Sequence, residues 1–218
     1  MQFVTYGINH NTAPVSIREN IAFNADVLPA ALASLKQQPY VVEAVILSTC
    51  NRTEIYCYID DDSHPLLNQW LHNFHQQAEN SLNEHLYCHQ GNDAMRHLLR
   101  VACGLDSMVL GESQILGQIK TAYSDALNAA TLGKMLGRLF QHAFTVAKQV
   151  RTDTAIGDSP VSVAFAAVSL AKQIFSNLAN STALLIGAGE TIELVARHLH
   201  DNGVGRIIIA NRTIERAH

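Results

Sequence analysis

The segment VVEAVILSTCNRTEIYCYI, from Val41 to Ile59, contains two strand-like runs on either side of a short polar turn. Residues 41–48 and 53–59 are rich in aliphatic, aromatic and β-branched side chains, which favour β-strands. We therefore expect two strands that flank the turn. The turn places a thiol, Cys50, two residues from a guanidinium, Arg52.

Elements on both sides of these strands extend the pattern. The sequence predicts strands over 3–8 and 86–88 and helices over 16–22, 26–37 and 65–77. The resulting β-α-β-β-α-β order is typical of a ferredoxin-like split βαβ sandwich. Further helices are expected over 92–103, 115–130 and 132–152.

The last third of the chain has a different pattern. A polar stretch containing Gly and Pro, 156–160, reads as a linker, and a helix is expected over 161–178. A buried strand over 182–186, a glycine turn, a helix to about 200 and a strand over 206–210 predict the start of a Rossmann sheet. We expect an α/β chain with a catalytic, substrate-binding α+β domain over 1–155. A linker helix and an incomplete nucleotide-binding domain would occupy 156–218.

Composition narrows the class of protein. A chain of 218 residues with 48% hydrophobic residues can bury a core and form more than one domain. The net charge of -4 argues against indiscriminate binding of polyanions. A local basic patch for RNA is still open, with Lys134, Arg138, Lys148 and Arg151 as candidates. No apolar run of about 20 residues and no signal peptide are evident, which favours a cytoplasmic protein with reduced thiols.

Cys50 is the first candidate for chemistry. A thiolate is the reactive form of cysteine, and a guanidinium such as Arg52 would favour it. The alternative is that Cys50 is a small buried apolar residue, the more common role of an isolated cysteine. Cys57, Cys88 and Cys103 lie within apolar patterns, so we assign them that second role.

Histidines raise the question of a metal site. The possible ligands match no structural zinc spacing, and a solvated helix face explains them equally well; they are His72, His75, His85, Cys88 and His89. No metal is expected. His97, on the helix predicted over 92–103, is either an acid/base group or a residue of the polar face.

The stretch GLDSMVLGESQILGQIK, from Gly104 to Lys120, is a glycine-punctuated loop that runs into a helix. It offers donors and acceptors for a polar ligand, and Gln114 and Gln118 lie one helical turn apart. An interdomain loop with capping residues is the alternative.

The GAGETI turn, Gly187 to Ile192, lies between a predicted strand and a predicted helix. Gly187 permits a tight turn, and Gly189 allows a pyrophosphate to approach the helix N-terminus. Ile192 occupies the third position of GxGxxG, where Gly or Ala is usual. After the next strand, Arg212 stands where an NAD enzyme has an acidic residue, which favours the 2′-phosphate of NADP. A phosphate-free βαβ turn is the alternative.

Five motifs together resemble glutamyl-tRNA reductase, the enzyme family that begins C5 tetrapyrrole (porphyrin, haem) biosynthesis. They are GINHNTAPVSIRE, LSTCNRTEIY, GLDSMVLGESQILGQIK, VSVAFAAVSLA and LLIGAGETIELVARHL with NRT. The resemblance extends from the first strand to the last residue. Members of this family continue into a completed NADPH domain and a C-terminal dimerisation domain, both expected to be absent from this chain.

The resemblance implies an oxidoreductase mechanism. Cys50 would attack the ester carbonyl of glutamyl-tRNA(Glu), release the tRNA and form a thioester. NADPH would supply the hydride that yields glutamate-1-semialdehyde. Arg52 would bind a glutamyl carboxylate, and His97 would handle a proton or position the substrate. No metal is required by this chemistry.

The resemblance also implies a set of binding residues. The substrate would be bordered by Thr49, Asn51, Arg52, Ser107, Glu112, Ser113, Gln114 and Gln118. Ser113 replaces a proline found in many relatives. The cofactor would be bordered by Gly187, Ala188, Gly189, Glu190, Thr191, Ile192, Asn211, Arg212 and Thr213.

The implied partners are glutamyl-tRNA(Glu), a second copy in a homodimer of the full-length protein, and glutamate-1-semialdehyde aminomutase for product transfer. No membrane is implied. Two alternatives remain open at this point. One is another thioester-forming, NADP-dependent acyl reductase, and the other is a non-catalytic fragment that binds tRNA or a protein partner.

Overall fold

The computed structural model of the chain describes residues 1–60, 63–77, 81–157, 163–175 and 177–213. It divides into two compact units, Met1–Asp158 and Ser159–His218. Each unit is described by itself.

The first unit is built on a four-stranded antiparallel sheet with the order β2-β3-β1-β4. Its strands are β1 (Gln2–Asn9), β2 (Val41–Ser48), β3 (Arg52–Ile59) and β4 (Tyr87–Gln90). This order, with the helices between the strands, is that of the ferredoxin-like sandwich predicted from the sequence. The hairpin of β2 and β3 has the predicted position, and β3 begins one residue earlier than expected.

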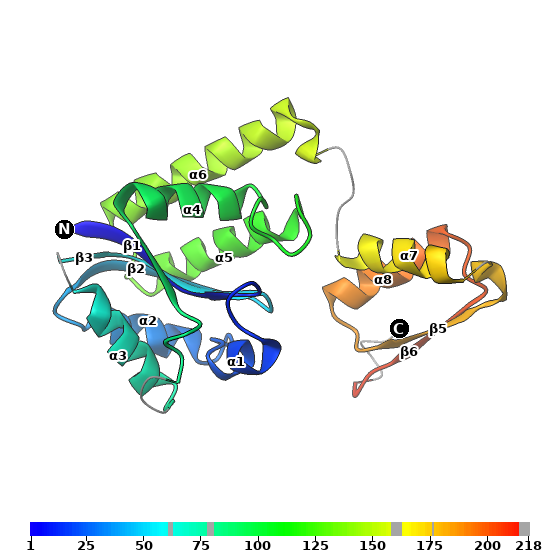
Figure 1. The fold of residues 1–218 in the computed structure, drawn as a ribbon, viewed down its shortest axis with the longest axis horizontal. Coiled ribbons are helices and arrows are strands. Elements are labelled where there is room, and N and C mark those ends of the chain that lie inside the picture. Colours follow the sequence, from blue (N-terminus) through cyan, green and yellow to red (C-terminus); the bar gives the residue numbers. More distant parts are fainter. Residues whose placement is uncertain (61–62, 78–80, 158–162, 176, 214–218) are drawn as a thin grey trace. The chain divides into compact units, whose positions relative to one another are not determined.

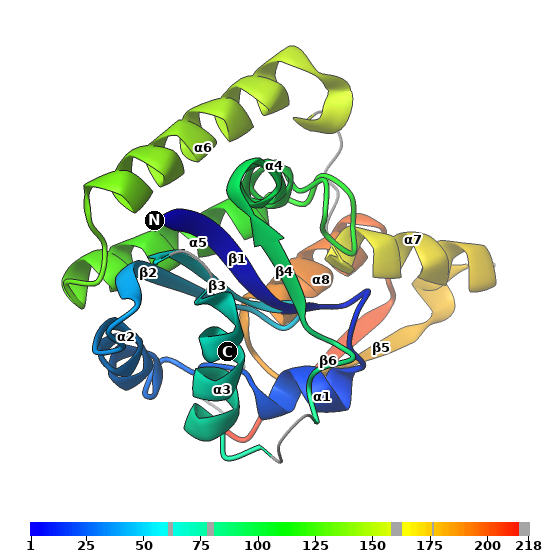
Figure 2. The ribbon, with the colours of Figure 1, turned by 60° about the vertical axis from the view of Figure 1, so that its left-hand side comes forward.

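Helices cover both faces of this sheet (Figures 1 and 2). On one face lie α1 (Val15–Asn20), α2 (Leu28–Lys36) and α3 (His64–Phe74). On the other lie α4 (Gly91–Ala102), α5 (Gln114–Asn128) and α6 (Lys134–Asp153). A sheet between two helical layers buries both of its faces, so polar residues in its strands need partners inside the protein.

Strand β3 carries buried charged side chains that need such partners. Successive side chains of a strand point to opposite faces. Tyr56 packs against Phe140 of α6, with ring centroids 5.6 Å apart, so the side chains of Arg52 and Glu54 share the α6 side. All three β3 side chains are buried, with at most 1% exposed. A charged pair therefore lies inside the sandwich.

Gly7 of β1 lies between Glu54 of β3 and Tyr87 of β4 in the register of the sheet. A Cβ atom at Gly7 would overlap the carbonyl oxygen of Thr53 and lie 2.8 Å from the Cα of Glu54. The missing side chain therefore allows the backbones of β1 and β3 to approach closely at this point.

A second buried carboxylate joins the sheet to α6. Glu43 of β2 accepts the backbone N–H groups of Met135, at 3.1 Å, and Leu136, at 2.6 Å. Both donors belong to the first turn of α6, where N–H groups have no partner within the helix. Glu43 therefore caps α6 and complements its dipole.

The second unit contains α7 (Val163–Ile174), β5 (Thr182–Ile186), α8 (Glu190–Asp201) and β6 (Arg206–Ala210). β5 and β6 pair in parallel, as predicted. A small core is formed by Val168, Leu185 and Leu199. A short 3-10 turn occupies Leu178–Asn180, and another, Ala155–Gly157, belongs to the first unit.

The predicted helix over 161–178 was too long. Its first two positions and most of the predicted linker, 158–160, lie outside the described residues. The helix ends at Ile174, and the side chain of Asn177 accepts the N–H of Ala179 at the start of a 3-10 turn. A side chain that bonds the local backbone competes with helix formation, which periodicity alone does not reveal. Among the described residues, none of the helices is long and apolar enough to cross a bilayer.

Gly7→Ala tests the close packing at the centre of the sheet. The added methyl group meets backbone atoms of β3 that cannot rotate away, so we expect the free energy of unfolding to fall by about 1–3 kcal/mol. Urea denaturation followed by circular dichroism measures this change.

Gly137→Ala is the matched control, because Gly137 lies within α6 and a Cβ atom there meets no atom within 4 Å. The same methyl group should raise stability by about 0.5–1 kcal/mol, since alanine favours the helix. Equal effects of the two substitutions would contradict the packing argument.

Candidate functional site

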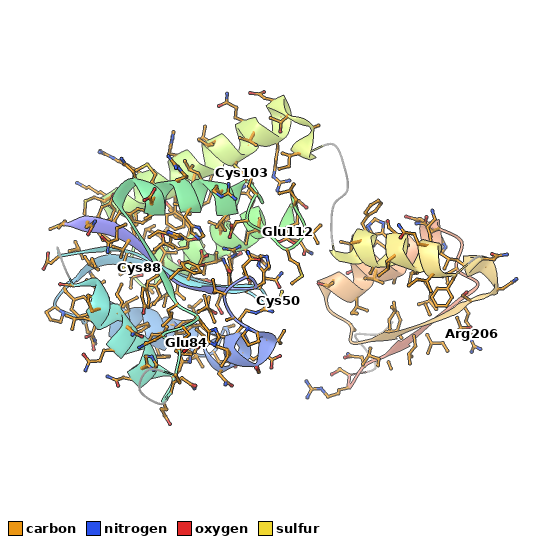
Figure 3. All side chains as sticks on the ribbon, viewed as in Figure 1. Cys50, Glu84, Cys88, Cys103, Glu112 and Arg206 are labelled. Carbon is orange, nitrogen blue, oxygen red and sulfur yellow. The ribbon has the colours of Figure 1, made fainter. Side chains whose placement is uncertain are left out.

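Cys50 lies on the three-residue turn between β2 and β3, at the end of the sheet, and its side chain is exposed (Figure 3). The N–H of Thr49 donates to the carbonyl of Arg52 at 2.8 Å. The hydroxyl Oγ1 of Thr49 accepts the N–H groups of Asn51, at 3.2 Å, and Arg52, at 3.1 Å. One hydroxyl that accepts two backbone donors stabilises a tight turn. The thiol is thus presented to solvent on a well-bonded backbone.

Arg18 of α1 holds the same turn from the side. It is buried, with 7% exposed. Its Nη1 donates to the carbonyl oxygen of Cys50, at 2.5 Å, and to Oδ1 of Asn51, at 3.3 Å. Its Nε donates to the carbonyl of Ala13 at 3.2 Å. One guanidinium therefore connects the Cys50 turn to the segment that follows β1.

Glu54 is the centre of a buried polar network. Its side chain is 0% exposed and accepts from Arg52 Nη1 at 2.6 Å and from His97 Nε2 at 2.9 Å. The hydroxyl groups of Tyr56 and Tyr87 also donate to it. An ionised carboxylate can accept all four bonds, which compensates for its removal from water.

The ionised carboxylate of Glu54 determines which of the neighbouring groups carry a proton. Burial alone would raise the pKa of Glu54, but Arg52 and His97 outweigh it and lower the pKa from 4.5 to about 2. Burial, followed by the charge of Glu54, raises the pKa of Tyr56 and Tyr87. Both tyrosines therefore stay protonated and donate. Because an ionised Glu54 only accepts, His97 must carry a proton on Nε2, which leaves its Nδ1 as the second ring nitrogen.

Asp106 connects this network to the loop between α4 and α5. Nη2 of Arg52 donates to the carbonyl of Asp106 at 2.5 Å and to its Oδ2 at 3.0 Å. The amide of Asn9 also donates to Oδ2, at 3.4 Å. In the same loop, the Oγ of Ser107 is buried and has no hydrogen-bond partner among the described residues. This hydroxyl is available to a ligand.

His10, directly after β1, lies among the same charges. Burial is the main cause that lowers its pKa; Arg52 and Arg18 act in the same direction, while Asp106 and Glu112 oppose them. The imidazole is therefore neutral at pH 7. Within the described part of the chain, its buried Nδ1 has no hydrogen-bond partner.

A cleft of about 440 Å³ lies beside the network, between the end of β1, β4 and α4. His89 and His97 both line this cleft, and the centroids of their rings are 4.6 Å apart. Its lining residues are of polar types and carry both signs of charge; they include Asn9, Tyr87, Asp93, Arg96, Arg100 and Asp106. Such a cleft suits a small polar ligand with an anionic group.

The structure brings together part of the residue set expected from the sequence. Thr49, Asn51 and Arg52 surround Cys50 in the turn, and Arg52 connects it through Glu54 to His97. Two alternatives left open by the sequence do not apply. Cys50 is exposed, so it is not a small buried apolar residue, and His97, at 8% exposure, is not on the polar face of α4.

The guanidinium of Arg52 already has partners within the protein, which the sequence did not predict. Its side chain is 1% exposed, and its Nη atoms already bond to Glu54 and Asp106. A substrate carboxylate has to share or replace one of these partners.

The remaining expected substrate residues lie on the loop and at the start of α5. Glu112 is 8% exposed, and its carbonyl accepts Nη2 of Arg151 at 2.6 Å. Ser113 is the N-cap of α5 but makes no side-chain cap bond. Gln114 and Gln118 lie outside the buried stripe of α5.

The sequence indicated Asp106 as a possible ligand contact, but several other residues of the network and of its surroundings were missed; they are Asn9, His10, Arg18, Glu54, Tyr56 and Tyr87. One of these residues, Glu54, could have been identified from the sequence pattern. Charged Arg52 and Glu54 are two residues apart at the start of a strand that is apolar and aromatic from Ile55 onward, which indicates a polar cluster on one face.

The expected cofactor residues belong to the second unit. Gly187 follows β5 with φ of 113°, a conformation that favours glycine. Gly189 is the N-cap of α8, where no side chain caps the helix and a Cβ atom would meet nothing within 4 Å. After β6, the amide of Asn211 donates to the carbonyl of Thr213 at 2.8 Å, and Arg212 is exposed. Backbone donors and a cation are thus available to a phosphate.

Among the described residues, no three His, Cys, Asp or Glu side chains are grouped as a metal site.

Comparison with known proteins identifies two family models. The model "Glutamyl-tRNAGlu reductase, N-terminal domain" matches residues 6–154, and the model "Shikimate / quinate 5-dehydrogenase" matches residues 169–218. The boundary between the matches falls between the two units of the structure.

Curated relatives match over the whole chain. The glutamyl-tRNA reductase of Nitrosococcus oceani is 61% identical over 218 residues, which cover 100% of this chain and 52% of the relative. The glutamyl-tRNA reductase of Alkalilimnicola ehrlichii is 58% identical, and the match covers 49% of that relative. The solved glutamyl-tRNA reductase from Methanopyrus kandleri has a TM-score of 0.65 and 35% identity, covering 99% of this chain and 50% of that one. The chain spans about half the length of the curated relatives it matches.

Glu54→Gln tests the central carboxylate. Because the folded pKa lies below 4.5, Glu54 stabilises the native state above that pH, and this contribution is lost as the pH falls from 4.5 toward 2. Removing the charge leaves buried Arg52 with Asp106, on Nη2, as its remaining ionic partner. We expect the free energy of unfolding at pH 7 to fall by about 3–5 kcal/mol. Its dependence on pH below 4.5 should become shallower.

Urea denaturation at pH 7, 5 and 3 measures both effects. Glu19→Gln, which removes an exposed carboxylate from α1, is the matched control and should change little. An acid dependence as steep in Glu54→Gln as in the wild type would contradict the assignment.

Proposed function

The chain belongs to the glutamyl-tRNA reductase family, and from this membership we propose that the full-length protein reduces the glutamyl group of glutamyl-tRNA(Glu) to glutamate-1-semialdehyde. The single observation that carries this proposal is the exposed thiol of Cys50 on a turn held by Thr49 and Arg18. A cysteine that serves only packing would be buried, as Cys57 and Cys103 are.

The first step uses this thiol as the nucleophile. The thiolate Sγ of Cys50 attacks the ester carbonyl carbon, a C–S bond forms, and the C–O bond to the terminal ribose breaks. The ribose oxygen takes a proton and leaves with the tRNA. The product is a thioester on the protein, which is more electrophilic than the oxygen ester it replaces.

The residues around Cys50 have separate roles in this proposal. Arg52 binds the carboxylate of the glutamyl side chain, which takes the place of Asp106 on Nη2 while Glu54 keeps Nη1. Thr49 and Asn51 frame the pocket. The unpartnered Oγ of Ser107 bonds a polar group of the substrate.

His97 handles the proton in this proposal. Glu54 holds the Nε2–H of the ring and fixes its orientation, so Nδ1 is the atom that exchanges a proton. The loop and the start of α5 complete the border of the substrate with Glu112, Ser113, Gln114 and Gln118.

We assign the cofactor to the second unit. The residues that would hold NADPH are Gly187, Ala188, Gly189, Glu190, Thr191, Ile192, Asn211, Arg212 and Thr213. The positive φ of Gly187 and the uncapped N-terminus of α8 fit a pyrophosphate, and exposed Arg212 fits a 2′-phosphate. When bound, NADPH supplies the hydride that reduces the acyl group to an aldehyde. No residue of the proposed chemistry requires a metal.

The wider setting follows from the family. We propose a cytoplasmic enzyme at the first step of C5 tetrapyrrole biosynthesis, with a catalytic domain over 1–155 and a nucleotide-binding domain that begins in 156–218. The full-length protein would form a homodimer and pass its reactive aldehyde to glutamate-1-semialdehyde aminomutase.

Trapping tests the nucleophile. Incubation with radiolabelled glutamyl-tRNA and no NADPH should leave label on the wild type, and mass spectrometry should locate one glutamyl group on Cys50. Cys50→Ser should lose this thioester, since a hydroxyl is a much weaker nucleophile at neutral pH. Cys88→Ser changes a half-buried thiol of β4 and should keep the label. Label of equal amount on Cys50→Ser would exclude the proposed step, and label from other acyl-tRNAs would favour a different acyl reductase.

Cofactor choice tests the role of Arg212. The full-length protein should bind NADPH more tightly than NADH, and Arg212→Ala should remove the difference, because the guanidinium pairs with the 2′-phosphate. Arg206→Ala, at the opposite end of β6, removes the same charge from an exposed site and should keep the preference (Figure 3). Isothermal titration measures these affinities, and equal binding of both nucleotides by the wild type would contradict the prediction.

A further inference from the structure

A groove of about 380 Å³ lies between α5 and α6, apart from the Cys50 turn. Three cations line it, namely Lys120 of α5 and Lys148 and Arg151 of α6. No aspartate or glutamate belongs to its lining. The groove is therefore a concave site of one sign of charge, which concentrates anions.

The charge of this region is opposite to that of the whole chain. Residues 91–153, from the start of α4 to the end of α6, contain seven Lys or Arg and five Asp or Glu, whereas the chain has a net charge of -4. Lys120 and Lys148 are exposed, and neither forms an ion pair within the described residues. Free cations gathered in one region point to an anionic partner rather than to internal pairing.

The remaining lining suits a nucleotide chain. Phe144 provides a half-buried aromatic ring, with the Nζ of Lys120 5.9 Å from its centroid. Gln141 and Thr145 are exposed on the same helix and offer hydrogen-bonding groups for ribose and phosphate. Cations that alternate with an aromatic ring are a usual feature of RNA-binding surfaces.

Arg151 joins this groove to the candidate site. Its Nη1 and Nη2 donate to the carbonyl oxygens of Gly111, at 3.2 Å, and Glu112, at 2.6 Å. The same loop carries Asp106, which bonds to Arg52. The Nε of Arg151 is buried and has no hydrogen-bond partner among the described residues. A ligand in the groove therefore lies against the residue that anchors the substrate loop.

We propose that the groove between α5 and α6 binds the phosphodiester backbone of the RNA part of the substrate. This inference rests on the proposed function, in which the glutamyl group arrives esterified to a tRNA. The Cys50 turn would contact only the glutamyl group and the end of such a substrate, so most of the binding energy has to come from phosphates elsewhere. The groove supplies the cations for these contacts.

Lys120→Gln/Lys148→Gln tests the groove without disturbing Arg151. Fluorescence anisotropy with tRNA(Glu) measures the affinity at several salt concentrations. Each lysine that neutralises a phosphate contributes about one unit to the salt slope of log K, so we expect the slope to decrease by about two. Affinity at low salt should fall on the order of tenfold.

Lys134→Gln/Arg138→Gln is the matched control, because it removes two charges from exposed positions of the same helix outside the groove. It should change the slope much less. Equal losses in the two double variants would overturn the groove and indicate only a diffuse field. Unchanged RNA affinity in Lys120→Gln/Lys148→Gln would overturn it as well, as would a wild type that binds anionic phosphatidylglycerol vesicles but not tRNA.

A second substrate separates this inference from the proposed function. Glutamyl-adenosine carries the same ester on a single nucleoside without phosphates. The groove variant should form the Cys50 thioester more slowly from glutamyl-tRNA and at the wild-type rate from glutamyl-adenosine. If the wild type forms no thioester from either substrate, the proposed function fails, while the RNA affinities still decide the groove. Equal slowing with both substrates would overturn the groove as an RNA site.

Discussion

The rest of the first unit depends on the hydrogen bonds and ion pairs that the buried carboxylate of Glu54 accepts. A charge with no exposure to water is tolerated only where donors replace the lost hydration. Its donors come from β3, β4 and α4, so one charge connects three elements that are distant in the sequence. Gly7 lies between Glu54 and Tyr87 in the register of the sheet and lets the backbones of β1 and β3 approach closely there.

This network supports the candidate site indirectly. Arg52 is held at Nη1 by Glu54, and its Nη2 bonds to Asp106 on the loop that would border the substrate. The Cys50 turn is held separately by Thr49 and Arg18. A stable scaffold with one exposed thiol is the arrangement that covalent catalysis needs, because the nucleophile keeps its position while the substrate changes.

The two units differ in how completely they bury their apolar surface. The sheet of the first unit has helices on both faces (Figures 1 and 2). In the second unit, Leu184 and Ile186 of β5 are 59% and 76% exposed, and Ile208 and Ile209 of β6 are 38% exposed. A parallel sheet is normally covered on both faces, and the prediction of a buried strand over 182–186 holds only at Leu185.

The sequence by itself determined the local elements of this protein. Alternating and continuous apolar runs predicted the β2–β3 hairpin and the β5–α8–β6 unit, because strand formation and turn chemistry depend on neighbouring residues. It also singled out Cys50 and the glycines at 187 and 189. Tertiary structure alone decided that Cys50 is exposed, that His97 faces inward, and that Arg52 is already engaged by Glu54 and Asp106. The bonds of Arg52 to Asp106 and of His97 to Glu54 join residues far apart in the chain, and only the packing of the sheet against α4 and the loop that follows it brings such residues within hydrogen-bonding distance.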